Sequence, residues 1–162
     1  MRVDYRRAFP DGVEARLGLE QAVHNSALEP ALLELVRIRA SQINGCAYCL
    51  AMHHRDARRR GEHLTRLDVV AAWREATELF TPRERAALAW CEALTELPRT
   101  GAPDDEYMAV AFAFTPGEIA ALTFAIVAIN SWNRLAVGLR TPATSLNGLD
   151  LPAPPPVPAD PA

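Results

Sequence analysis

Residues 30–61 read PALLELVRIRASQINGCAYCLAMHHRDARRRG, and this stretch predicts two consecutive helices joined by a tight turn. Pro30 suits the first position of a helix, and the apolar residues that follow it recur at helical spacing. An Asn-Gly pair then interrupts the pattern, because this dipeptide is typical of turns. The second helix is expected to open near Cys46 and to close at Gly61, which would serve as its C-terminal cap.

The rest of the chain carries further helix signals, and strand signals are nearly absent. Thr65 with Asp68 resembles a capping box, and stronger Thr-Pro-x-Glu helix starts occur at Thr81 and Thr115. The start at Thr115 precedes a long apolar segment, and a shorter helix is expected over residues 104–113. The fold class predicted from these signals is all-α, with the two helices of residues 30–61 forming a hairpin.

We expect one helical domain over residues 1–141 and a proline-rich tail over residues 142–162. Seven of the last 21 residues are prolines, so the tail is expected to be disordered or extended along a neighbour. The N-terminus lacks the apolar segment of a secretory signal, and the most apolar stretch, residues 119–129, is too short to span a membrane. These features predict a cytoplasmic protein that does not act in a membrane.

The composition excludes several classes of chemistry. All 17 basic residues are arginines, so no lysine is present to form a Schiff base or to hold a phosphate in a phosphate-binding loop. A formal net charge of -3 argues against a nucleic-acid-binding protein that works through a basic face. The chain has three cysteines, and in a reducing compartment two closely spaced thiols favour catalysis or metal binding over a structural disulfide.

Cys46, Cys49 and His53 together suggest thiol chemistry at the start of a helix. The unpaired N–H groups and the positive end of the helix dipole favour a thiolate there, and His53 lies one turn beyond Cys49 on the same face. If the two helices fold back as a hairpin, the carboxylate of Glu34 could lie beside the thiols. Thiol, imidazole and carboxylate are the groups that nucleophilic attack with proton transfer requires.

Two other interpretations of these residues remain open. Cys46 and Cys49 could be small buried residues without chemistry, as is expected for Cys91, which has no partner at disulfide spacing. They could instead bind zinc together with His53 and either His54 or His63. Seven residues of helix separate Cys46 from His53 by about 10 Å, however, whereas zinc ligands lie about 2.0–2.3 Å from the metal. We therefore predict neither a metal nor a bound cofactor.

The spacing Glu34, Cys46-x-x-Cys49-x-x-x-His53 resembles the active-site signature of the alkylhydroperoxidase D (AhpD)-like proteins of the carboxymuconolactone decarboxylase superfamily. The resemblance covers roughly residues 1–141 and includes the segments LLELVRIRASQINGCAYC, LFTPRERAALAWCEALTEL and LTFAIVAINSWNRLAVGLR. It implies an all-helical domain that assembles into trimers or hexamers. It also implies an antioxidant enzyme that reduces alkyl hydroperoxides.

The resemblance further implies a role for each residue of the motif. Cys49 would attack the peroxide and become a sulfenic acid, and Cys46 would resolve it as a Cys46–Cys49 disulfide. Glu34 and His53 would relay protons to and from the reacting atoms. An external dithiol or a redox partner protein would then reduce the disulfide.

One residue departs from the family pattern. The best-studied peroxidase branch has a relay histidine just before the second cysteine, where this chain has Tyr48. A phenol with a pKa near 10 shuttles protons poorly at neutral pH. The alternative function is therefore a dithiol–disulfide exchange protein that reduces a peroxiredoxin-type partner and has little peroxidase activity of its own. A third possibility is a non-catalytic scaffold whose thiols are vestigial.

Overall fold

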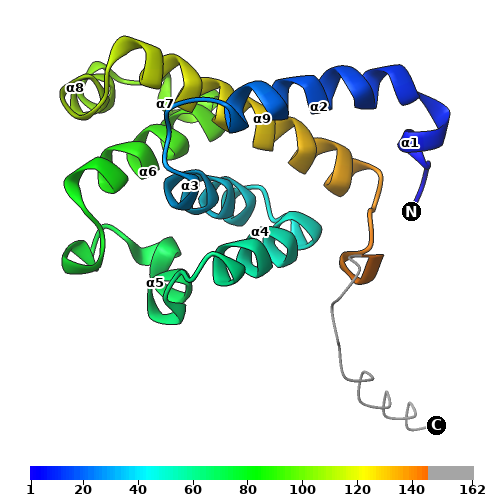
Figure 1. The fold of residues 1–162 in the computed structure, drawn as a ribbon, viewed down its shortest axis with the longest axis horizontal. Helices are drawn as coiled ribbons and strands as arrows, with labels where there is room; N and C mark the ends of the chain where they lie inside the picture. The colour runs from blue at the N-terminus through cyan, green and yellow to red at the C-terminus, as the bar shows by residue number, and fades with distance from the viewer. Residues whose placement is uncertain (146–162) are drawn as a thin grey trace, which may run out of the picture.

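The computed structural model describes residues 1–145, and every regular element in that part of the chain is a helix (Figure 1). The α-helices are α1 (Tyr5–Ala8), α2 (Pro10–His24), α3 (Pro30–Ile43), α4 (Ala47–Arg59), α5 (Leu64–Val69), α6 (Pro82–Thr95), α7 (Leu97–Thr100), α8 (Asp104–Ala113) and α9 (Pro116–Gly138). Short 3₁₀ turns occur at η1 (Val70–Ala72), η2 (Thr77–Leu79) and η3 (Ala143–Ser145). The all-α prediction is confirmed.

The tail predicted over residues 142–162 lies mostly outside the described residues. Its first residues do not follow the expectation of a segment without helix, because η3 is a turn of 3₁₀ helix that packs against α4. Residues 146–162, which hold most of the predicted tail, are not described.

Helix α3 is the centre of the fold. It packs against α4, α6 and α9, and Figure 1 shows it lying between α9 and α4. Leu35, Val36 and Ile38 are fully buried although they point to different sides of the helix, since successive helical residues are about 100° apart. A helix that is apolar on several sides needs neighbours on several sides, and the other helices supply them.

The turn between α3 and α4 places the two thiols. Asn44 ends α3, and Gly45 adopts a left-handed backbone (φ +63°) that a side chain would disfavour. The amide of Cys46 then donates to the carbonyl oxygen of Ser41 at 3.0 Å, which closes the turn. The Asn44 side-chain amide donates to Oδ1 of Asn133 at 3.1 Å and ties the turn to α9. The predicted hairpin is therefore present, with α4 beginning directly after Cys46.

The two Thr-Pro-x-Glu helix starts behave as predicted. Thr81 and Glu84 form a complete capping box at the start of α6, and Thr115 and Glu118 form another at the start of α9. In each case the threonine hydroxyl accepts from the glutamate amide while the carboxylate accepts from the threonine amide.

The predicted capping box at Thr65 and Asp68 is wrong. The residue that caps α5 is His63, whose Nδ1 accepts a hydrogen bond from the Thr65 amide at 3.2 Å. The α-helix also ends at Val69 and continues as the 3₁₀ turn η1, rather than running on through the alanines. An imidazole can serve as the acceptor that a helix start needs, although serine, threonine, aspartate and asparagine are the usual choices.

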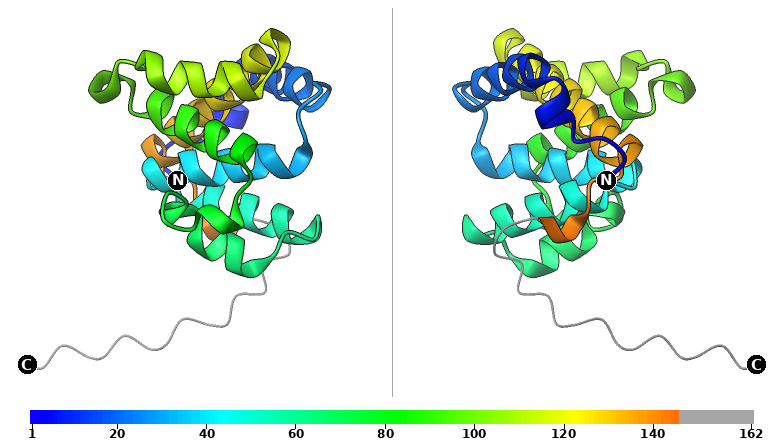
Figure 2. Two further views of the ribbon diagram at one scale, coloured as in Figure 1. Left: turned by 90° about the vertical axis from the view of Figure 1, so that its left-hand side faces the viewer. Right: turned by 90° about the vertical axis from the view of Figure 1, so that its right-hand side faces the viewer.

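Helices α1 and α2 were not expected from the sequence. α2 lies along α9, and the N-terminal segment meets the end of α9, where the amide of Arg2 donates to the carbonyl oxygen of Leu139 at 2.7 Å (Figures 1 and 2). Of the 15 residues of α2, Val23 is the one that is fully buried. Its apolar periodicity is correspondingly weak, which explains why the pattern was not visible.

Helix α9 is long and apolar enough to cross a membrane by length and composition alone. Within the fold its apolar residues have a different use, because Leu122, Ile126 and Ile129 are buried in the core. The same helix carries two buried polar side chains, Asn130 and Asn133, each hydrogen-bonded inside the domain.

Candidate redox site

Cys46 and Cys49 lie together at the beginning of α4. Cys46 is the N-cap residue, and its Sγ accepts a hydrogen bond from the amide of Cys49 at 3.4 Å. Both side chains are buried, and both are free thiols in this structure. The cysteine sulfur thus occupies the place where an N-cap oxygen usually satisfies an unpaired amide.

The two thiols differ in pKa. A hydrogen bond from the Cys49 thiol, together with the Cys49 amide and the Asn133 side chain, lowers the pKa of Cys46 to about 6 although burial opposes this. The pKa of Cys49 is raised, because its thiol proton is shared with Cys46 and because it is buried. At neutral pH the pair therefore carries one negative charge and one proton, with the charge mainly on Cys46.

Glu34 and His53 form a buried pair beside the thiols. Nδ1 of His53 lies 2.8 Å from Oε2 of Glu34, and Nη1 of Arg37 donates to Oε1 of Glu34 at 2.9 Å. Burial alone would raise the pKa of Glu34, but the hydrogen bond with His53 and the charge of Arg37 lower it instead. An ionised carboxylate only accepts hydrogen bonds, so Nδ1 of His53 is the donor. This leaves Nε2 of His53 available for a proton.

A chain of ion pairs holds this pair in position. Arg37 donates through Nη2 to Oε2 of Glu20 at 3.0 Å, and Oε1 of Glu20 accepts from the Trp132 indole at 3.0 Å. Arg16 completes the chain, with Nη2 lying 2.8 Å from Oε1 of Glu20. Helices α2 and α9 are thereby connected to Glu34, so a part of the chain that the sequence did not predict as helix braces the site.

A cavity of about 540 Å³ opens beside these residues. Cys49, Glu34, His53 and Tyr48 line it. The rest of its wall combines apolar side chains with charged ones, namely Tyr5, Arg6, Val13, Leu17, Glu20, Arg37, Met52, Asp56, Arg60, Trp132 and Ala136. The space is large enough for a small organic molecule that would reach Cys49, Glu34 and His53 together.

The structure brings the four residues of the motif into one region, but they line two different cavities. Cys49, Glu34 and His53 line the large cavity, whereas Cys46 lines a smaller neighbouring cavity of about 120 Å³. Tyr48, the residue that departs from the family pattern, lines both. Its hydroxyl accepts a long hydrogen bond from Nη2 of Arg6 at 3.4 Å.

Asn133 is the residue at this site that the sequence marked only weakly. It is 1% exposed, its side-chain amide donates to Ser41 at 3.0 Å, and it acts to lower the pKa of both the Cys46 and Cys49 thiols. The signal in the sequence was a polar residue inside an apolar helix, which needs partners when it is buried. Nothing local indicated that this side chain would act on the two thiols.

The remaining histidines do not join the site as metal ligands. Within residues 1–145, no group of three or more His, Cys, Asp or Glu side chains is arranged to hold a metal ion. His63 caps α5, and His54 is partly exposed on α4. The described part of the chain therefore gives the zinc interpretation of Cys46, Cys49 and His53 no support.

Comparisons with known proteins agree with this fold. Residues 10–93 match the model of the carboxymuconolactone decarboxylase family. An uncharacterized protein of Bacillus subtilis (strain 168), YdfG, is 35% identical over 144 residues, which cover 89% of this chain and 97% of that protein.

Solved structures extend the comparison. A crystal structure of ATU0492 from Agrobacterium tumefaciens, a protein of unknown function described as a candidate antioxidant defence protein AhpD, is 41% identical with a TM-score of 0.84. The match covers 87% of this chain and 96% of that one. A variant of the debrominase Bmp8 in complex with 2,3,4-tribromopyrrole has a TM-score of 0.75 at 18% identity, over 84% of this chain and 72% of that one, and shares the fold. The chain thus belongs to the carboxymuconolactone decarboxylase family, as an AhpD-like member.

Proposed function

We propose that this protein is a thiol-dependent reductase of organic hydroperoxides. The observation that carries the proposal is the shared cavity, in which Cys49 is reached from the same space as the Glu34–His53 pair. The likeness to ATU0492, described as a candidate antioxidant defence protein, supports the same class of activity.

In the first step, Sγ of Cys49 attacks the terminal oxygen of the hydroperoxide and the O–O bond breaks. The Cys49 thiol proton passes to Nε2 of His53, which hands it to the departing alkoxide. Cys49 is oxidised to a sulfenic acid, and the peroxide is reduced to an alcohol. Glu34 stabilises the imidazolium that forms in between, because its carboxylate already accepts from Nδ1.

In the second step, the Cys46 thiolate attacks the sulfur of the Cys49 sulfenic acid. A Cys46–Cys49 disulfide forms, and the oxygen of the sulfenic acid leaves as water after it takes up one proton from the buffer. The depressed pKa of Cys46, about 6, suits this resolving role because the thiolate is already present at neutral pH. An external dithiol then returns two electrons to the pair.

Single-turnover oxidation of two serine variants tests the assignment of roles. In Cys46→Ser, one equivalent of cumene hydroperoxide should be consumed, and a sulfenic acid should remain on Cys49 for trapping with dimedone. In Cys49→Ser, peroxide consumption should fall to the rate of a free thiol. The opposite result, with a sulfenic acid on Cys46 in Cys49→Ser, would assign the attack to Cys46. Consumption by both variants at the rate of the unchanged protein would exclude the mechanism.

The second candidate function is dithiol–disulfide exchange with a partner protein. Tyr48 favours it, since a phenol that accepts from Arg6 stands where the peroxidase branch has a relay histidine. The N-cap thiolate of Cys46 is also typical of exchange proteins. The two functions differ in one measurement: an exchange protein reduces a peroxiredoxin-type disulfide quickly but reacts with cumene hydroperoxide no faster than free cysteine does.

We further propose that the protein works as a homo-oligomer. Phe112, Phe124 and Val127 of α8 and α9 are 97%, 55% and 51% exposed, which is unusual for large apolar side chains. Sedimentation equilibrium should give a mass of three or six chains, and Phe112→Glu should lower it. A single-chain mass for the unchanged protein would contradict the proposal.

A further inference from the structure

Access to the two sulfurs is restricted to cavities. Cys46 and Cys49 are each 1% exposed, so an external molecule reaches either sulfur only where a cavity does. The rate of thiol–disulfide exchange depends on which sulfur can be approached. The positions of the two cavities therefore decide where each reagent of a redox cycle acts.

The two cavities are lined by different parts of the chain. Leu17, Glu34 and His53 line the large cavity together with Cys49, but they do not line the small one. Val137 and Arg140, at and beyond the end of α9, line the small cavity together with Cys46.

Tyr48 and Ala136 line both cavities and form the wall that they share. The peptide between the two cysteines thus separates a Cys49 side from a Cys46 side.

We propose that the reductant enters by a route of its own, through the small cavity, and attacks Cys46, while the peroxide reaches Cys49 through the large one. The inference rests on the proposed redox cycle of the two thiols, although it does not require a peroxide to be the oxidant. The ligand class assigned to the small cavity is a dithiol that presents one thiolate on a narrow, unbranched group, because the space is about 120 Å³.

Polar groups around the small cavity fit an incoming thiolate. The Arg140 side chain is exposed and makes no ion pair or hydrogen bond within residues 1–145. Oγ1 of Thr141 is buried without a hydrogen-bond partner, so a group of the ligand can satisfy it. The positive end of α4 lies at Cys46 itself. Each of these features favours a negative or hydrogen-bonding ligand on the Cys46 side.

The reductant thiolate attacks Sγ of Cys46, the Cys46–Cys49 bond breaks, and Cys49 leaves as a thiolate. The second thiol of the reductant gives its proton to Cys49 and then attacks the reductant's sulfur in the mixed disulfide. Cys46 leaves as a thiolate, and the reductant departs as a disulfide, having lost two electrons. The low pKa of Cys46 makes it a good leaving group in this last step.

The test uses two tryptophan variants that block one cavity each. Val137→Trp narrows the small cavity and Leu17→Trp narrows the large one, and both positions are partly exposed, at 40% and 54%, so the larger side chain is tolerated. The two half-reactions are measured separately by stopped flow. Oxidation uses reduced protein and cumene hydroperoxide, and reduction uses diamide-oxidised protein and dithiothreitol.

Val137→Trp should slow reduction by about tenfold and leave oxidation unchanged, whereas Leu17→Trp should do the reverse. Reduction slowed by Leu17→Trp but not by Val137→Trp would show that both reagents use the large cavity and would overturn the proposal. Equal rates for both variants in the reduction assay would overturn it as well. Because diamide forms the disulfide, a protein that fails to react with cumene hydroperoxide loses its proposed function while the reductant route is still measured.

A second pair of variants tests the role of the positive charge of Arg140. Arg140→Glu places a negative charge at the small cavity and should slow reduction by dithiothreitol, with a weaker effect at high salt. Arg60→Glu is the matched control, because Arg60 lines the large cavity and is likewise exposed. Equal reduction rates for these two variants, both at low salt, would contradict a role for Arg140 in steering the thiolate.

Discussion

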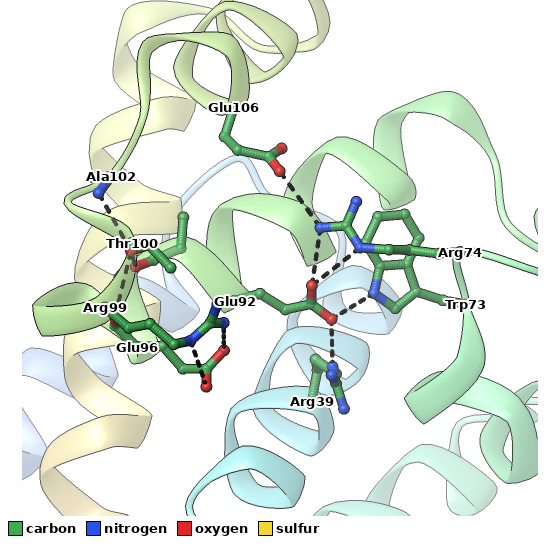
Figure 3. Close-up of polar contacts among 10 residues, drawn as sticks. Arg39, Trp73, Arg74, Glu92, Glu96, Arg99, Thr100, Ala102 and Glu106 are labelled. Atoms are coloured by element: carbon green, nitrogen blue, oxygen red, sulfur yellow. Dashed lines mark hydrogen bonds and ion pairs between the residues drawn. The ribbon is translucent and has the colours of Figure 1, made fainter.

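Two regions of this molecule hold a cysteine close to a glutamate that arginines bind, and one of them is the candidate site. In the first, Glu34 binds Arg37 next to the Cys46–Cys49 pair. In the second, Glu92 follows Cys91 on α6. Figure 3 shows Arg39, Trp73 and Arg74 converging on Glu92.

The two regions differ in whether their polar groups and thiols remain accessible to another molecule. Both oxygens of Glu92 accept from arginine or from the Trp73 indole, so the carboxylate ties α3 and the segment after α5 to α6. Cys91 is fully buried in mid-helix, and burial raises its pKa to about 12.

At the first region, His53 keeps a ring nitrogen free and a cavity reaches Cys49. A thiol beside an acid becomes a site only where a free proton carrier and an entrance are also present.

The largest difference is expected between two variants that each remove one thiol, Cys49 from the first region and Cys91 from the second. Cys49→Ser should lower peroxide turnover by at least about a thousandfold, because no other group can form the sulfenic acid that faces the cavity. Cys91→Ala should leave turnover unchanged, since Cys91 lines neither cavity near the thiols. Steady-state peroxide consumption with excess dithiothreitol measures both. A loss of turnover in a folded Cys91→Ala variant would erase the distinction between the two regions.

Substitution of the two glutamates should have different effects, one on activity and the other on stability. Glu34→Gln should lower the peroxide rate by about a hundredfold, because the neutral amide no longer supports a charged His53. Glu92→Gln should instead lower the free energy of unfolding by about 1–3 kcal/mol, through its lost charged hydrogen bonds, and leave the rate per folded molecule unchanged. Urea unfolding and single-turnover oxidation provide the two readings. A Glu34→Gln variant that loses stability but keeps its rate would make Glu34 a structural residue like Glu92.

The hairpin and the four-residue motif could be predicted from the sequence because their signals are local. Gly45 favours the turn by its own backbone freedom, and Cys46 follows it directly, so the thiols had to stand at a helix start. The boxes at Thr81 and Thr115 each need one residue and its third neighbour. Such signals can be recognised in the sequence without knowledge of the tertiary fold.

The rest depends on contacts between distant segments. Helix α2 has a weak apolar face, and its role at the site comes from Glu20, which meets Arg37 and Trp132 only after folding. The unequal pKa values of the thiols come mainly from the Cys46–Cys49 contact itself, but a distant residue also acts on them. Asn133, which lies 84 residues beyond Cys49 in the sequence, favours the thiolate form of both cysteines.

The pH dependence of the two regions should differ widely. Folding lowers the pKa of Cys46 to about 6, so its rate of alkylation by iodoacetamide should rise through pH 6 and level off above it. Below pH 6 both thiols are protonated, and the rate should fall about tenfold for each pH unit. Cys91, with a pKa of about 12, should stay unmodified until the protein unfolds. Mass spectrometry of peptides after timed alkylation follows each cysteine, and a Cys46 midpoint near that of free cysteine would contradict the assigned charge.

The smallest effect is expected at Asn133, because the change concerns a single side-chain amide. Asn133→Asp keeps the acceptor for Asn44 but puts a negative charge beside the two sulfurs, so the pKa of the pair should rise. The alkylation midpoint should move to higher pH, and turnover at neutral pH should fall while turnover at high pH recovers.

The control for Asn133→Asp is Ser41→Ala. It removes the hydroxyl that Asn133 bonds without touching either thiol, and it should leave the midpoint unchanged. If both variants shift the midpoint equally, Asn133 acts by general packing. If only the aspartate shifts it, the charge on the thiols depends on one side chain of α9, which the fold brings to the start of α4. Cys91 also has a hydroxyl partner, Thr95 of α6 at 3.9 Å, but burial outweighs it and keeps the pKa of Cys91 raised, so the two regions differ mainly in access and burial.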